Sequence, residues 1–141
     1  KYLPYLRYYD NNYFYNRIGR TPSSESDTII KFDFGSNRKV DLRSYLIKTG
    51  SDGPNLRHPK MWRIEGSNDG QSWTELDRRS NDGNLNDKYR EYPYVCKLGN
   101  SGSKSNLFRY IRYVNEDSWG SNYKYDIEVS YFELYGNVVT V

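Results

Sequence analysis

Three polar segments contain the residue types that could recognise a ligand. They read SDGPNLRHP (51–59), RSNDGNLNDKY (79–89) and NEDSWGSNY (115–123). Planar amide, carboxylate and guanidinium groups offer fixed pairs of hydrogen bonds to hydroxyl groups, and an aromatic ring can stack on the apolar C–H face of a pyranose. This combination favours a sugar ligand. The candidate ligand-binding residues are Asp52, Arg57, His58, Arg78, Asn81, Asp82, Asn84, Asp117, Trp119, Asn122 and Tyr123.

The same residues have structural alternatives. His58 precedes a proline and could simply anchor its loop. Arg78 and Arg79 follow each other in an extended segment, so alternation sends them to opposite faces and at most one can point at a given ligand. Trp119 lies between a serine and a glycine, where burial is less automatic, and both readings stay open for it. Local Asx turns could engage Asn81, Asp82, Asn84 and Asn86.

Metal and covalent chemistry have little support in the chain. A zinc site needs several Cys or His ligands, and the chain has only His58 and Cys96. A nucleophilic triad would depend on His58 with no nucleophile motif near it, and the scattered carboxylates do not indicate a glycosidase pair. We therefore expect no catalytic residue, no metal-ligating residue and no enzymatic activity.

The composition indicates one folded domain over residues 1–141. The chain has 16 Tyr, 5 Phe and 3 Trp, a hydrophobic content of 35% and a mean hydropathy of −1.01. This is too polar for a membrane protein, yet buried Tyr rings supply large apolar area while their hydroxyls reach polar partners. The net charge of +3, with no block of five basic residues, gives no reason to expect a nucleic-acid partner.

Cysteine and asparagine usage bear on the compartment. Cys96 is the single cysteine, so no disulfide can form within the chain, and none of the Asn residues lies in an N-x-S/T sequon. Both observations favour an intracellular location.

The elements that must position these segments are short strands. Turn residues recur every eight to twelve positions, which is typical of an all-β protein, and no apolar helical stripe persists beyond two turns. The predicted class is an antiparallel β-sandwich or jelly roll. Near the N-terminus, a short helical turn is expected around residues 3–9. The predicted strands are 28–34, 40–49, 60–67, 73–79, 91–98, 107–114 and 125–136.

Antiparallel order also predicts which loops share an end. Each connection reverses the chain, so alternate loops lie together. Loops 20–27, 50–59, 79–90 and 115–124 should gather at one end, which we take as the binding end. Loops 35–39, 68–72 and 99–106 should lie at the other end and act as connections, because they contain small residues and no aromatic side chain.

One hairpin leads to a family resemblance. In SNDGQSW (67–73), Asn68, Asp69 and Gly70 are expected to supply the left-handed conformations of a tight turn between two strands, whose Trp62 and Trp73 we place in the core. The longer string HPKMWRIEGSNDGQSWTELDRRSNDGNLND (58–87) resembles the coagulation factor V/VIII type C, or discoidin, family of the galactose-binding-like superfamily. FRYIRYVNEDSWGSNYKYDIEVSYFELYG (108–136) and YFYNRIGRTPSSESDTIIKFDFG (13–35) extend the resemblance over most of the chain.

The chain departs from the family pattern in three places. The usual first strand looks absent, and we expect the tail GNVVTV (136–141), or a segment of a neighbouring domain, to fill its position. The bracketing cysteine pair of extracellular members is missing. The early loop lacks the run with which some sugar-binding members of the superfamily hold structural calcium, so no cofactor is expected.

The resemblance implies ligand binding by loops at one end of a discoidin-like, galactose-binding-domain-like sandwich. Weak, lectin-like binding of a glycan or glycoprotein, of the kind used in adhesion, is the primary expectation. Two alternatives remain open. The chain could be a protein-recruiting module of a larger intracellular protein, or it could dock peripherally on a phospholipid surface through the apolar side chains of Leu56, Trp119 and Leu85.

Overall fold

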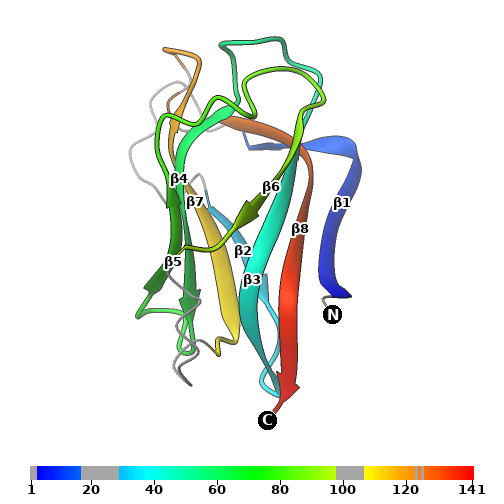
Figure 1. Ribbon diagram of the computed structural model, residues 1–141, viewed down its shortest axis with the longest axis vertical. Helices are drawn as coiled ribbons and strands as arrows, with labels where there is room; N and C mark the ends of the chain where they lie inside the picture. The colour runs from blue at the N-terminus through cyan, green and yellow to red at the C-terminus, as the bar shows by residue number, and fades with distance from the viewer. Residues whose placement is uncertain (1–2, 17–28, 98–106, 123, 125) are drawn as a thin grey trace.

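Two antiparallel sheets make up the fold (Figure 1). The computed structural model describes residues 3–16, 29–97, 107–122, 124 and 126–141. One sheet has the order β1-β8-β3-β6 and the other β2-β7-β4-β5, so the predicted all-β antiparallel sandwich is confirmed. The strands are β1 (Leu3–Asn16), β2 (Ile29–Asp33), β3 (Arg38–Thr49), β4 (Pro59–Ser67), β5 (Thr74–Arg79), β6 (Glu91–Val95), β7 (Tyr110–Ser118) and β8 (Ile127–Thr140).

The seven strands predicted from alternation are all present, with shifted ends. In β7, Ile111 and Tyr113 are buried between the sheets while Arg112 lies on the outer face, as a period of two requires. β7 starts later than predicted and continues to Ser118, and β8 continues to Thr140. Within the described residues no helix is long and apolar enough to cross a membrane.

The N-terminal segment differs from expectation. The predicted helical turn over residues 3–9 is wrong, because residues 3–16 form β1 and pair with β8 from Leu3↔Gly136 to Asn16↔Ile127. The sheet position beside β8 is therefore occupied by β1. The tail after Gly136 fills no vacant position: it lengthens β8 along β3, with Arg38 opposite Thr140. Pairing with the distant strand β8 determines the extended conformation of residues 3–16, for which local propensity was ambiguous.

Aromatic rings form the centre of the core, as the composition predicted. Tyr45 stacks on Tyr94 at 5.3 Å and on Phe132 at 5.8 Å between ring centroids. Trp62 meets Tyr94 edge-on at 5.1 Å, and its placement in the core is confirmed by complete burial. The rings come from β3, β4, β6 and β8, so they join the two sheets through large apolar contact areas.

A buried chain of hydrogen bonds also joins the sheets. The Trp62 indole N–H donates to the Tyr45 hydroxyl at 2.9 Å, and that hydroxyl donates to the Asp77 carboxylate at 2.5 Å. Arg79 donates to the same carboxylate at 3.0 Å and to the carbonyl oxygen of Val95 at 2.6 Å. Burial, followed by the Asp77 charge, raises the pKa of Tyr45 well above its usual range, so the phenol stays a donor.

The second tryptophan of the hairpin is not in the core, so this prediction is wrong. Trp73 precedes β5 and is only partly buried, with the Arg112 guanidinium 3.9 Å from its ring centroid and Tyr110 6.5 Å away. Arg112 and Tyr110 belong to the outer face of the second sheet. The ring therefore covers the surface of the sheet by a cation–π contact.

Candidate functional site

Three loops meet at one end of the sandwich, at the top of Figure 1. They are the β3–β4 loop (50–58), the β5–β6 loop (80–90) and the β7–β8 loop (119–126), hereafter the binding end. Alternation of antiparallel strands had predicted this grouping. The fourth segment predicted there, 20–27, lies outside the described residues.

Backbone and amide hydrogen bonds tie the three loops together. The backbone N–H groups of Trp119 and Gly120 donate to the carbonyls of His58 and Leu56 at 3.0 and 2.7 Å. Asn55 and Asn86 exchange two hydrogen bonds, one of 2.8 Å from the Asn55 backbone N–H and one of 3.0 Å from the Asn86 amide. Contacts between loops far apart in sequence give this end a fixed shape before any ligand arrives.

In the β3–β4 loop, the charged side chains and the imidazole of His58 form hydrogen bonds to groups of the same loop. Arg57 makes two hydrogen bonds to the Asp52 carboxylate, at 2.7 and 3.0 Å, and these bonds lower the pKa of Asp52. His58 is completely buried, and its Nε2 lies 2.9 and 2.8 Å from the carbonyl oxygens of Asp52 and Gly53. Two carbonyl neighbours require Nε2 to be the donor. His58 therefore holds the loop, the structural alternative noted from its sequence position.

Asp82 holds the second loop in contact with its neighbours. Its carboxylate accepts hydrogen bonds from the Asn84 backbone N–H at 2.9 Å, the Asn84 amide at 3.2 Å and the Tyr94 hydroxyl at 3.0 Å. Its backbone N–H donates to Lys60, and its carbonyl accepts the Trp119 indole N–H at 2.7 Å. Burial and the nearby carboxylate raise the pKa of Tyr94, which remains a donor. Asp82 is thus a positioning residue.

Trp119 places a partly buried aromatic ring at this end. Its indole N–H donates to the Asp82 carbonyl, which orients the ring, and its backbone N–H donates to the His58 carbonyl, which holds the main chain that carries it. The side chain is only partly buried, and the ammonium of Lys60 lies 4.8 Å from the ring centroid. Lys60 was not among the predicted site residues, because it belongs to strand β4 and the prediction considered loop residues.

The remaining predicted polar residues are placed differently. Asn81, with a φ of 50°, and Asn122 are exposed, and their side chains make no hydrogen bond within the described residues. Asn84 is exposed and uses one amide proton on Asp82. Asp117 is partly buried and accepts the Ser118 backbone N–H at 2.9 Å. Tyr123 lies outside the described residues.

Arg78 is not brought to this end. It lies on β5, where its guanidinium contacts Glu75 and Glu116, each at 2.8 Å, on the outer face of the second sheet. Arg79 points instead to Asp77, so the prediction that the two arginines face opposite ways is confirmed. Leu85 is completely buried in the core, so it cannot insert into a membrane. Of the three apolar side chains considered for membrane docking, Leu56, which is 36% exposed, and the partly buried Trp119 remain.

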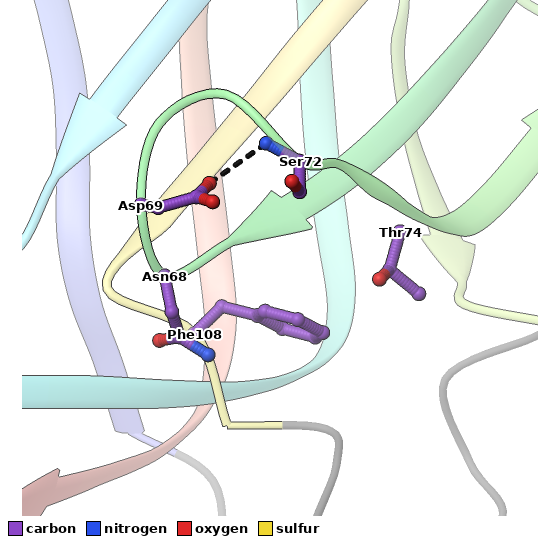
Figure 2. Close-up of a pocket in the computed structure, with 5 residues that line it drawn as sticks. All are labelled: Asn68, Asp69, Ser72, Thr74 and Phe108. Atoms are coloured by element: carbon purple, nitrogen blue, oxygen red, sulfur yellow. Dashed lines mark hydrogen bonds between the residues drawn. The ribbon is translucent and has the colours of Figure 1, made fainter.

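A pocket of about 310 Å³ lies at the opposite end, beside the hairpin at 67–73 (Figure 2). Its acidic group, Asp69, accepts the backbone N–H groups of Gln71 and Ser72 at 2.8 and 2.7 Å, which holds its pKa well below the usual range. Only Gly70 of the turn has a positive φ, at 76°, so the left-handed conformations expected for Asn68 and Asp69 are wrong. The polar groups here mainly stabilise the turn.

Metal-ligand geometry is missing from the described part of the chain, where no three His, Cys, Asp or Glu residues lie together in a way that could hold an ion. Cys96 is fully buried, and this burial raises the pKa of its thiol to about 12. A thiol in this state behaves as a small apolar side chain.

The fold is similar to those of solved carbohydrate-binding modules and of a chitobiase domain. The family 32 carbohydrate-binding module of Streptococcus pneumoniae EndoD matches with a TM-score of 0.54 and 9% identity, over 96% of each chain. The C-terminal domain of a chitobiase from Bacteroides fragilis gives a TM-score of 0.53 and 20% identity, over 79% of this chain and 64% of that one. These likenesses show the fold, an antiparallel β-sandwich. Module CBM32-3 from a Clostridium perfringens family 31 glycoside hydrolase matches less closely, with a TM-score of 0.50, 14% identity and coverage of 97% and 92%.

A curated relative at the sequence level is the peptide-N(4)-(N-acetyl-beta-glucosaminyl)asparagine amidase of Arabidopsis thaliana. It is 34% identical over 87 residues, which is 58% of this chain but 12% of the amidase. The chain therefore spans about an eighth of that relative. No family model matches the chain.

Proposed function

We propose that the chain is a non-catalytic carbohydrate-binding module that holds a sugar weakly at the binding end. The observation that carries the proposal is the Trp119 ring, which hydrogen bonds to Asp82 and His58 fix in a partly exposed position. Exposed amides of Asn81 and Asn84 belong to the adjoining loop. A fixed ring beside such donors and acceptors suits a pyranose, and the likeness of the fold to carbohydrate-binding modules supports the same reading.

We also infer that the chain is a member of the factor V/VIII type C, or discoidin, family. The support is its ordered motifs, notably WRIEGSNDGQSW (62–73) and FELYG (132–136), together with the antiparallel β-sandwich fold. His58, the single histidine, is buried with Nε2 bonded to two carbonyls, which argues against catalysis by histidine and supports a non-catalytic role. We infer that no resident metal is needed.

The expected affinity is low. A stacked ring contributes about 0.5–1.5 kcal/mol and each net hydrogen bond about as much, so a ring and three or four bonds give a Kd on the order of 1 mM. Repeated weak contacts on a multivalent glycan would raise the apparent affinity.

A glycan array followed by calorimetry on the 141-residue chain tests the proposal. Trp119→Ala should reduce sugar affinity by about two- to tenfold, because a stacking contribution of about 0.5–1.5 kcal/mol is removed. Trp73→Ala is the matched control, since it removes a partly buried tryptophan from the outer sheet face. Equal effects of the two variants, or no binding of the wild-type chain to any sugar, would refute the proposal. Melting temperatures show whether each variant is folded.

A second candidate is recruitment, and the amidase relative favours it. We propose that the chain is one module of a larger protein, in which it would hold a glycoprotein near a catalytic partner domain. If no sugar on the glycan array binds, and a protein binds in a pull-down that depends on residues 50–58 and 80–90, recruitment through protein contacts is supported instead. The single Cys96 and the missing sequons support an intracellular setting, which microscopy of the tagged protein would test.

A further inference from the structure

The binding end places a cation beside its aromatic ring. Lys60, the second residue of β4, holds its ammonium 4.8 Å from the centroid of the Trp119 ring. Within the described part of the chain, Lys60 makes no ion pair, and its side chain is only partly buried. A ring face attracts a cation without neutralising it, and at a partly exposed site the contact contributes only about 0.5–1 kcal/mol, so a ligand can displace the ammonium from the ring while the positive charge stays within reach.

Nearby carboxylates are engaged with other groups. Asp52 receives two hydrogen bonds from Arg57. Asp82 receives three from Asn84 and Tyr94. The Asp87 carboxylate accepts the Lys88 backbone N–H and lies 3.7 Å from Arg90, and that of Asp117 accepts the Ser118 backbone N–H. None of these carboxylates forms an ion pair with Lys60, so its charge is available to an acidic ligand.

From this arrangement, and resting on the proposed function, we propose that the binding end selects glycans that carry an acidic group. On binding, the Lys60 ammonium leaves the ring face and the sugar ring stacks on Trp119 in its place. The ammonium then pairs with a carboxylate or sulfate on the sugar, and the exposed amides of Asn81 and Asn122 exchange hydrogen bonds with its hydroxyls. A neutral sugar of the same shape would keep the stacking contact and lack the ion pair. Lys60 is then the residue that determines specificity.

The test compares matched sugars by calorimetry on the full chain. The probes are galactose, galacturonic acid, a sialyl-galactose disaccharide and a sulfated galactose. At least one acidic sugar should bind about three- to tenfold more tightly than galactose, and the preference should shrink as salt rises, because the partly exposed pair is screened. Lys60→Gln should abolish the preference, and Lys60→Arg should retain it.

Lys31→Gln is the matched control. Lys31 also lies over a ring, 5.3 Å from the centroid of Tyr110, but on the outer sheet face. The same loss of charge there should leave sugar binding unchanged. Separate results for sialate, uronate and sulfate identify the source of the acidic group.

The outcomes distinguish this inference from the proposed function. Equal binding of galactose and every acidic sugar would overturn the inference while the carbohydrate-binding proposal stands. The same holds for an acidic preference that survives Lys60→Gln. Failure of the wild-type chain to bind any of the sugars would overturn both.

Discussion

Replacing Asp82 by alanine should destabilise the protein from within the binding end. The carboxylate accepts three hydrogen bonds, and the donor that suffers most is the Tyr94 hydroxyl, because that side chain is only 1% exposed. A buried hydroxyl left without its charged acceptor costs about 1–3 kcal/mol. The two donors of Asn84 are exposed and can turn to water. We therefore expect the free energy of unfolding to fall by about 2–3 kcal/mol.

Urea denaturation of a double-mutant cycle measures this directly. Tyr94→Phe alone should cost about 1 kcal/mol, but in the Asp82→Ala background it should be neutral or stabilising, since it removes the hydroxyl that has lost its acceptor. Asp117→Ala is the control. Its carboxylate accepts one local backbone bond, so its replacement should cost no more than about 0.5 kcal/mol. A loss below about 0.5 kcal/mol for Asp82→Ala, or full additivity with Tyr94→Phe, would refute the positioning role.

Three further predictions concern acid, metal and packing. Hydrogen bonds from Arg57 lower the folded pKa of Asp52, so the stabilisation is complete above the unfolded pKa of about 3.9 and is lost as pH falls through the lower folded pKa. The melting-temperature gap between wild type and Arg57→Gln should therefore close below about pH 4, and a gap unchanged at pH 2 would contradict this. EDTA and excess calcium should each leave the melting temperature unchanged within about 1 °C, because no resident metal is proposed; a larger rise with calcium points to a site. Gly66→Ala should destabilise the fold by about 1–3 kcal/mol or more in urea, since its Cβ would clash with the Phe108 ring, whereas Gly83→Ala, with nothing within 4 Å, should be nearly neutral.

The sheets and the grouping of the loops were accessible from the sequence because they depend on local patterns. Alternation in β7 and regular turns predicted strands, and reversal of direction placed residues 50–58 and 80–90 at one end. The conformation of residues 3–16 was not accessible, because it is decided by pairing with a strand more than 100 residues away. Trp73 was misplaced because it lies just before β5, where alternation no longer dictates the buried face.

The roles within the loops depended on contacts that a sequence pattern does not encode. Asp52 and His58 look like ligand contacts, but the conformation of the loop turns both toward its own groups. Asp82 and Lys60 lie more than 30 residues away from Trp119, and only folding brings them to its ring. Side-chain direction in irregular segments follows from such non-local bonds, whereas in strands it follows from the pleat.

The course of β8 decides how the molecule can be attached to a surface. The strand carries the chain to Val141 at the end of the sandwich farthest from the three loops (Figure 1). A biotin or linker coupled at that residue would therefore present every immobilised copy with its loops directed toward solution. Dense immobilisation in this orientation would turn millimolar contacts into measurable retention of a multivalent glycan, while random coupling through lysines would modify Lys60 itself.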